Sequence, residues 1–150
     1  MIAIAQFLAD EHHSCDESFA TAEEAAQTGD LVGCRQRFQP FRTAMEHHFQ
    51  KEEQVLFPAF EQATGNTMGP TRVMRLEHQQ MRQTLTEMEQ ALTGSDLDDF
   101  LGQAETLLIL MQQHNIKEEQ ILYPMCDRML GAAVGPVIQD MRDLPAEPLA

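Results

Sequence analysis

The chain carries one pattern of charged and imidazole side chains twice, and the two copies are offset by 66 residues. In each copy a Glu-His pair precedes a second histidine, and a glutamate follows that second histidine at i+4. The copies are Glu11, His12, His48 and Glu52, then Glu77, His78, His114 and Glu118. Residues four apart share one face of a helix. The duplication therefore predicts two related helical hairpins, in which each residue has a repeat partner 66 positions away.

Apolar residues recur at spacings of three and four in four segments, which is helical periodicity without strand alternation. Turn-forming residues separate the segments at 28–30, 63–70 and 93–96, and Gly131 ends the last one. Asp30 and Asp96 stand where helix N-caps are expected, and Pro70 suits a first helical position. The four stripes are Ile4, Leu8, Cys15 and Phe19; Phe41, Met45, Val55 and Ala59; Met74, Met81, Leu85, Met88 and Leu92; and Leu107, Met111, Ile121 and Met125.

A length of 150 residues fits one domain with a substantial core. Short connections between long helices favour antiparallel neighbours. We expect an all-α fold, an up-down-up-down four-helix bundle of two hairpins about a pseudo-twofold axis. Residues 1–130 would form this bundle, and residues 131–150 a C-terminal tail with one short helix.

The net charge of -14 argues against nucleic acid as a partner, because phosphate binding needs a basic face. No uninterrupted apolar run reaches the length of a membrane span, so we expect no membrane partner. The first ten residues have no basic region and do not read as a secretory signal. Three cysteines without a CxxC motif fit a reducing cytosol. We therefore expect a cytoplasmic protein.

The histidines and glutamates of the repeat occupy gaps in the apolar stripes, so they should face the bundle core. His12 falls between Leu8 and Cys15, and the other members of the pattern fall in equivalent gaps. Buried imidazoles and carboxylates facing one another without a cation would be badly unsatisfied. The sequence predicts a metal site made by these residues: His12, His48, Glu52, His78, His114 and Glu118.

Imidazole and carboxylate ligands suit iron, manganese or zinc, and the absence of cysteine ligands argues against an iron–sulfur centre. Two octahedral metals offer about twelve coordination positions, of which four histidines, two bridging glutamates and a bridging oxygen fill about ten. About two positions stay open. An unsaturated, redox-capable centre in an apolar bundle suits small diatomic gases or peroxide.

The two remaining histidines, His13 and His47, lie one position off the stripe, and their repeat partners are Gln79 and Gln113. Glutamine does not replace an imidazole ligand. We therefore interpret both histidines as residues of the rim, with direct metal binding as the lesser alternative.

Glu53 and Glu119 are repeat partners that also lie off the stripe, so we expect them behind the ligands or on the surface. Lys51 and Lys117, the only lysines, should lie on the solvated flank. These charged residues are not expected to bind metal.

The sequences from His48 to Pro58 and from His114 to Pro124, with Glu11-His12 and Leu76-Glu77-His78, resemble the hemerythrin-like HHE cation-binding family. The resemblance covers about residues 1 to 130. It implies a four-helix bundle holding two iron ions, in a non-heme di-iron centre bridged by two carboxylates and an oxo or hydroxo group. It also implies that the six residues of the predicted metal site are the ligands.

One departure from the O2-carrying members of that family concerns the third helix, where they have a second histidine. Arg82 occupies that position here, and the fourth helix has Glu118 at i+4 from His114 where carriers use an HxxxxD pair. We expect Arg82 to pair with Asp16, its repeat partner, across the pseudo-twofold axis; Asp16 as an extra ligand is a minor alternative. The departure argues against simple reversible O2 transport.

The leading hypothesis is a di-iron protein that binds or reduces O2, NO or peroxide in oxidative or nitrosative stress or a redox role, with a reductant protein as a further partner. The alternatives are an oxygen or iron sensor that signals to a partner, an O2 carrier, and an iron store. Ferritin-like stores use Glu-x-x-His pairs, which this chain lacks. A zinc hydrolase is weaker, because there is no HExxH motif. Nothing in the sequence decides whether the protein is an enzyme. We expect no additional domain of the kind that iron-centre repair relatives carry.

Overall fold

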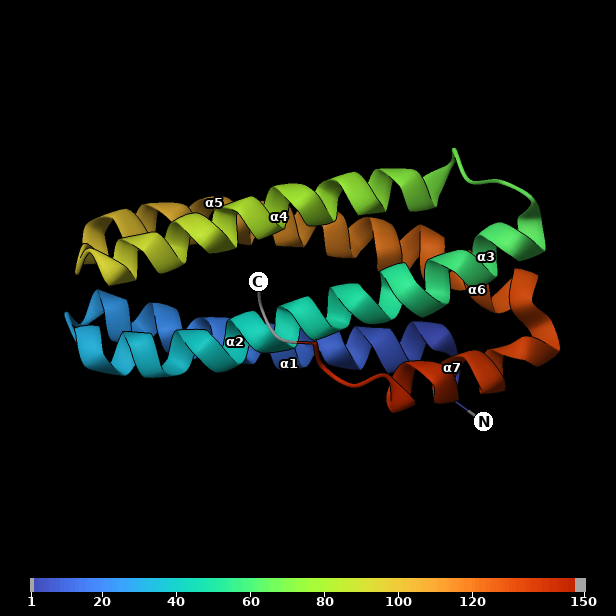
Figure 1. Cartoon of the computed structure of the whole chain (residues 1–150), viewed down its shortest axis with the longest axis horizontal. Helices are drawn as coiled ribbons and strands as arrows, with labels where there is room; N and C mark the ends of the chain where they lie inside the picture. Colours follow the sequence, from blue (N-terminus) through green and yellow to red (C-terminus); the bar gives the residue numbers. More distant parts are fainter. Residues whose placement is uncertain (1, 148–150) are drawn as a thin grey trace.

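The computed structural model describes residues 2–147, and all regular secondary structure in this part of the chain is helical, with no strand. Four long helices pack as a helical bundle (Figure 1). The first is α1 (Ile4–Gln27) and the third is α4 (Pro70–Thr93). The second runs without a break through α2 (Leu31–Lys51), the π-helical segment η1 (Glu52–Leu56) and α3 (Phe57–Thr64). The fourth runs through α5 (Leu97–Lys117), the π-helical segment η2 (Glu118–Leu122) and α6 (Tyr123–Leu130).

The turns between the long helices follow the predicted chemistry. The Asp30 carboxylate accepts from the backbone N–H of Gly33 at 2.9 Å, and the Asp96 carboxylate accepts from that of Asp99 at 3.0 Å. Both aspartates are N-caps, as the sequence predicts. Gly65 ends α3 with a φ of 70°, a left-handed conformation that glycine adopts without strain. These caps fix where each hairpin reverses.

Two π-helical segments interrupt the second and fourth long helices at equivalent positions, and each begins at a glutamate of the predicted metal site. The backbone N–H groups of Phe57 and Tyr123 bond to the carbonyls of Glu52 and Glu118, five residues back. The next residue in each copy is a proline, which has no N–H to continue the α-helical ladder. A π turn brings residues i and i+5 onto one face of the helix.

Two apolar clusters fill the bundle. One is built around Phe38, Phe41 and Phe100 near the α1–α2 and α4–α5 turns. The other is built around Leu8 and Phe57 at the opposite end. The buried histidines and glutamates lie between these clusters in the sequence of every helix, so the polar layer has apolar packing on both sides.

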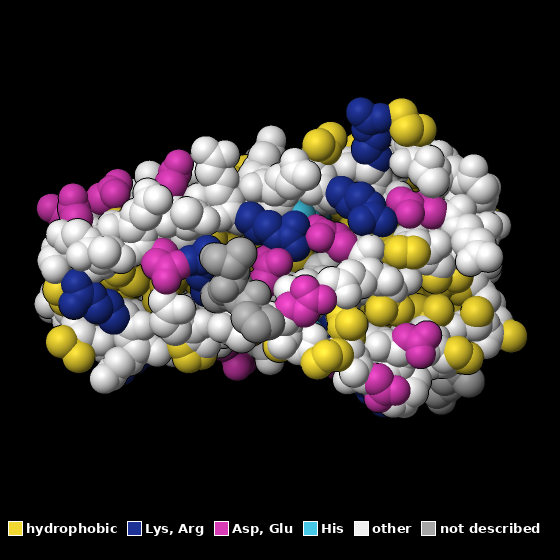
Figure 2. All heavy atoms as spheres, viewed as in Figure 1, with side chains coloured by type: hydrophobic (Ala, Val, Ile, Leu, Met, Phe, Trp, Pro, Cys, Tyr) yellow, Lys and Arg dark blue, Asp and Glu magenta, His cyan; other side chains and the backbone are white. Residues whose placement is uncertain are grey.

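The chain beyond Leu130 covers one side of the bundle. A 3₁₀ turn η3 (Gly131–Ala133) leads into α7 (Val134–Asp143), which packs against η1 and α1. The segment after α7 crosses α2, where the Leu144 carbonyl lies 2.8 Å from the His47 imidazole (Figure 1). In Figure 2 hydrophobic side chains gather at the end formed by α3, α6 and α7, and acidic and basic groups alternate elsewhere on that face.

Within the described residues, one helical stretch, Leu97–Asp143, contains a window of mean hydropathy 1.2 that is long and apolar enough to cross a membrane. A core helix passes the same test, and 33% of the window is buried in the bundle. Leu107 and Met111 on this stretch belong to the core. Glu105 and Glu118 interrupt it, which is why no uninterrupted apolar run is found in the sequence.

Replacing the N-cap Asp96 with alanine should lower the free energy of unfolding by about 1 kcal/mol, because a backbone N–H at the start of α5 loses its acceptor. Chemical denaturation monitored by circular dichroism measures the change. Glu105→Ala, at an exposed position within α5, is the control and should stay within about 0.5 kcal/mol of the parent. Equal effects of the two substitutions would contradict the capping role.

Candidate metal centre

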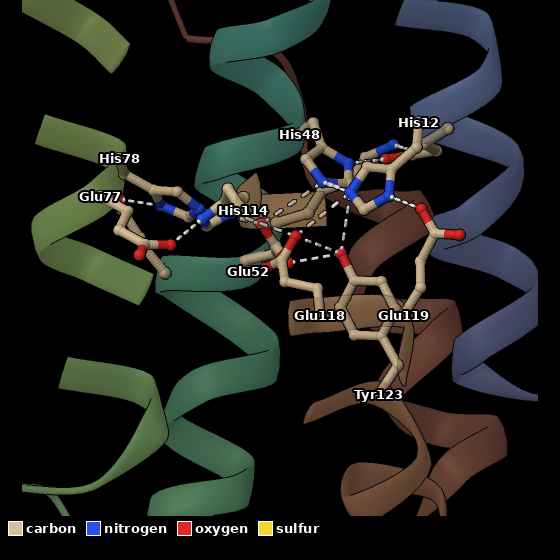
Figure 3. Close-up of polar contacts among 12 residues, drawn as sticks. His12, His48, Glu52, Glu77, His78, His114, Glu118, Glu119 and Tyr123 are labelled. Atoms are coloured by element: carbon tan, nitrogen blue, oxygen red, sulfur yellow. Dashed lines mark hydrogen bonds and ion pairs between the residues drawn. The ribbon is translucent and has the colours of Figure 1, made fainter. Parts of the chain in front are cut away.

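The structure brings all six predicted ligand residues together in one layer across the bundle (Figure 3). Each long helix contributes one histidine, and each π segment contributes the glutamate at its start. All six side chains are buried, and both glutamates are 0% exposed. The layer contains His12 from α1, His48 from α2, Glu52 from η1, His78 from α4, His114 from α5 and Glu118 from η2.

Each central glutamate is shared between the two hairpins. Glu52 Oε1 lies 3.3 Å from His48 Nε2 and 3.1 Å from His78 Nε2. Glu118 Oε1 lies 3.1 Å from the Nε2 atoms of both His12 and His114. The Nε2 atoms of the four imidazoles therefore point at the two carboxylates, and each carboxylate contacts two imidazoles.

The outer nitrogen of every one of these imidazoles is held by a further carboxylate, at distances between 2.6 and 2.8 Å. The pairs are His12 with Glu119, His48 with Glu11, His78 with Glu53, and His114 with Glu77. A carboxylate at Nδ1 keeps the proton on that nitrogen, which leaves the Nε2 lone pair directed at the centre. This is the tautomer that binds a metal. The expectation that Glu53 and Glu119 lie behind the ligands or on the surface agrees with these contacts.

Four buried polar atoms of the centre have no hydrogen-bond partner among the described residues: Glu52 Oε1, Glu118 Oε2, His78 Nε2 and His114 Nε2. Leaving such atoms unpaired costs about 1–3 kcal/mol each. The donor atoms fall into two sets, and within each set they all lie within 4.8 Å of one another. One set is Glu52, His78, His114 and Glu118, and the other is His12, His48 and Glu118. A cation bound by each set would satisfy the unpaired atoms, so the residues present fit metal ions.

Lysines extend two of the outer pairs in the same way in both hairpins. Glu11 accepts from Lys51 as well as His48, and Glu77 accepts from Lys117 at 2.5 Å. Burial would raise the pKa of Glu11, but His48 and Lys51 outweigh it and lower that pKa to about 2. The expected solvated position is wrong for Lys51, which is only 9% exposed and has its ammonium group on Glu11 and over the ring of Phe7. The Lys117 side chain is 47% exposed.

Arg82 does not form the predicted pair with Asp16. Its guanidinium binds Glu53 with two hydrogen bonds of 2.9 and 3.0 Å and Glu46 with one of 2.9 Å. Glu53 in turn holds His78, so Arg82 fixes the outer support of a ligand from the position where carriers have a histidine. Asp16 is exposed beside Glu119, on the side of His12.

The other two histidines lie outside the central layer. His13 is exposed, and His47 is half-buried with its ring nitrogen 2.8 Å from the Leu144 carbonyl. Neither belongs to the two sets of clustered donors in the described chain. Both positions agree with the interpretation of these histidines as rim residues.

Sequence reasoning missed Tyr123, whose hydroxyl reaches the middle of the layer from α6 (Figure 3). The hydroxyl lies 2.7 Å from Glu52 Oε2, 2.8 Å from Glu118 Oε1 and 3.2 Å from His12 Nε2. Its repeat partner Phe57 carries no hydroxyl. Burial, and then the charges of the two glutamates, raise the pKa of the Tyr123 phenol well above its usual range in the metal-free site.

In a regular α-helix, a residue five positions after a ligand would not point into the same part of the bundle core as that ligand. The spacing of the apolar stripe therefore did not indicate that Tyr123 reaches the centre. The π turn at Glu118 moves it there. The only signal in the sequence was the difference between Phe57 and Tyr123 within an otherwise similar pair of motifs.

A family model described as the Hemerythrin HHE cation binding domain matches residues 3–126 of the chain. The match runs from α1 into α6 and contains all six residues of the central layer as well as Tyr123. The searches of curated proteins and of solved structures returned no match to the chain.

The pKa of His114 leads to a pH prediction for the metal-free protein. Burial would lower this pKa, but the Glu118 carboxylate outweighs it and raises the value to about 9, from 6.5 for a free side chain. Protonated His114 therefore stabilises the folded state relative to the unfolded state. This contribution is complete below pH 6.5, and it disappears as the pH rises through about 9. Thermal unfolding of metal-free protein should therefore show a falling midpoint across that interval.

A bound cation needs the neutral imidazole, so it should reverse this trend by displacing the proton. The affinity for an added divalent cation, measured by titration calorimetry, should rise over the same pH interval with release of protons to the buffer. His114→Gln should reduce the pH dependence of the metal-free midpoint without abolishing it, because the carboxylates of the centre also raise the pKa values of His48 and His78 against the effect of burial. A flat midpoint in the parent protein would contradict the assignment.

Proposed function

The chain belongs to the hemerythrin HHE cation-binding domain family, and we propose that its central layer binds two iron ions and reacts with a small oxidant, O2, NO or peroxide. The observation that carries this proposal is that two donor sets share one carboxylate, that of Glu118. His78, His114 and Glu52 would hold one cation and His12 and His48 the other, with Glu118 available to both. Imidazole and carboxylate donors together suit iron.

Tyr123 supports iron over zinc and makes the two donor sets unequal. Its hydroxyl lies within hydrogen-bond reach of His12, in the set with His48, whereas Phe57 packs against His78 in the other set, with ring centroids 5.7 Å apart. A phenolate oxygen is a hard donor that suits ferric iron. We propose that Tyr123 fills one of the two positions left open by the six predicted ligands, so that one position stays free.

The residues of the chain provide a dry and fixed centre for this chemistry. The two apolar clusters exclude water from above and below, and the outer carboxylates hold each imidazole in its metal-binding tautomer. Arg82 holds Glu53 in place and leaves the third helix with a single ligand. When bound, two ferrous ions would supply two electrons, enough to reduce one peroxide to two waters.

Several finer expectations accompany this proposal. We take the four long helices to run alternately up and down, because short turns join α1 to α2 and α4 to α5. We place the protein in the cytoplasm, where a reductant protein would restore the ferrous state, in a redox or stress-response role. Reversible O2 transport is the alternative, and Arg82 in place of a second histidine argues against it.

Iron loading of metal-free protein without O2 should give about two irons per chain, one for each donor set. Exposure to O2 or peroxide should then produce a near-ultraviolet oxo-to-iron absorption band that persists when the oxidant is removed. His12→Ala should lower the iron content, whereas His13→Ala, at the exposed neighbouring position, should leave it intact. A chain that takes up zinc alone, or an oxygenated form that releases O2 under vacuum, would overturn the redox proposal.

Tyr123→Phe tests the seventh ligand independently of reactivity. The ferric parent should show a visible phenolate-to-iron charge-transfer band with matching tyrosinate vibrations in resonance Raman spectra, and both should vanish in the variant. The variant should still bind about two irons, because the six other donors remain. The control is Phe57→Leu, which keeps an apolar side chain beside His78 and should retain the band. A parent without this band would limit Tyr123 to hydrogen bonding.

A further inference from the structure

The two hairpins have equivalent surface pockets beside the centre, and the pockets differ in size. The α1–α2 pocket has a volume of about 190 Å³ and is lined by Glu11, Ser14, Cys15, Ala44, His47, His48 and Lys51. The α4–α5 pocket has a volume of about 50 Å³ and is lined by Glu77, Gln80, Met81, Leu110 and Gln113. Each lining residue of the small pocket is the repeat partner of a residue of the large one. We call the larger pocket, between α1 and α2, the open seam, and the smaller pocket, between α4 and α5, the closed seam. The pseudo-twofold axis relates one to the other.

Four lining positions differ between the copies, and at three of them the α4–α5 pocket has the larger side chain. Ser14 and Cys15 in the open seam correspond to the larger Gln80 and Met81. Ala44 corresponds to Leu110, whose side chain is half-buried in the closed seam. The helices and the ligands are otherwise matched across the repeat. Side-chain size at these three positions therefore accounts for the difference between the two pockets.

The open seam leads from the surface to a ligand. Ser14 and Ala44 are exposed at its rim, whereas Cys15 and His48 are buried at its floor. His48 lies in the central layer, with its Nε2 3.1 Å from that of His12. A molecule in this pocket would therefore lie beside His48, one of the residues of the central layer.

The lining of the open seam selects for neutral molecules that form hydrogen bonds. The charges of Glu11 and Lys51 compensate each other through their ion pair. The Ser14 hydroxyl, the Cys15 thiol and the His47 imidazole add donors and acceptors without adding a fixed charge. The strongly acidic chain disfavours anions generally. Hydrogen peroxide has the required size and polarity, whereas O2 and NO gain little from a polar lining.

We propose that the α1–α2 seam is the access site through which a small neutral hydroperoxide, with hydrogen peroxide as the simplest case, reaches the centre. This inference rests on the proposed function. In the reaction concerned, hydrogen peroxide takes two electrons from two ferrous ions and two protons from solvent; its O–O bond breaks, and two waters and two ferric ions result. The α4–α5 seam plays no part in access.

Closing the open seam tests the proposal. In the variant Ser14→Gln/Ala44→Leu, both positions take the side chains of the closed seam, and both lie at an exposed rim where the fold tolerates change. Anaerobic stopped-flow oxidation of the iron-loaded protein by hydrogen peroxide should slow about tenfold, which corresponds to about 1.4 kcal/mol of added barrier. Iron content and the ferric spectrum should equal those of the parent.

The reciprocal substitution provides a matched control and a rescue. Gln80→Ser/Leu110→Ala opens the other seam, and combining it with the closed variant moves the accessible pocket from one hairpin to the other. If pocket width controls access, this combination should recover most of the parent rate. A closed variant that reacts with peroxide at the parent rate, with its iron content unchanged, would overturn the proposal.

A second readout needs no metal. Methyl methanethiosulfonate transfers a methylthio group to a cysteine thiolate and releases methanesulfinate, and mass spectrometry locates the product. In metal-free protein Cys15 should be modified faster than Cys34 and Cys126, which are 0% exposed and lie outside the seam. The closed variant should slow the labelling of Cys15 and leave the other two unchanged. Equal labelling of Cys15 in parent and variant would contradict access through this seam.

The two readouts distinguish failure of the seam from failure of the proposed function. If the parent binds no redox-active metal but Cys15 labelling depends on the seam, the iron proposal fails and the access pocket stands. If the parent binds iron and reacts with peroxide at a rate that the closed variant shares, the iron proposal stands and the access site is wrong.

Discussion

The burial of two carboxylates and four imidazoles in one layer is the constraint on which the rest of the structure depends. Isolated groups of this kind are costly in a core, since each loses its hydration. On the outer side of the layer, four further carboxylates replace part of this lost hydration, because each forms a hydrogen bond with one imidazole Nδ1. On the inner side several donor atoms stay unpaired. Positive charge at the centre would pair with these atoms. The binding of cations should therefore stabilise the bundle.

The duplication explains how a chain of this length can provide so many aligned donors. Each hairpin supplies half of the layer, and each central glutamate contacts one histidine from either hairpin. Each donor set contains residues from both hairpins, since the set with His78 and His114 includes Glu52, and the set with His12 and His48 includes Glu118. Packing of the hairpins and assembly of the centre are therefore coupled.

The sequence predicted the helices, the capping aspartates and the six residues of the layer, because all of these follow the regular periodicity of an α-helix. It did not predict the positions of side chains that depend on irregular backbone or on contacts between residues far apart in the sequence. Tyr123 enters the layer through a π turn that shifts the register after Glu118. Lys51 is buried against α1, where it contacts Glu11 and Phe7, and no pattern within its own helix indicates that contact. Arg82 was expected to pair with Asp16, but the outer carboxylate Glu53 lies closer and is itself held by His78.

Function in such a duplicated centre has to come from the places where the two copies differ. The six residues of the layer are matched in type across the repeat, so they alone would give two equal metal positions. The copies differ at Phe57 and Tyr123, which places one phenol oxygen beside His12, and at Ala44 and Leu110, which opens one seam. Both differences lie on the side of the donor set that contains His12 and His48. A phenolate ligand would stabilise ferric iron at that position, while the seam admits reactant on the same side, so the two irons would take unequal parts in the reaction.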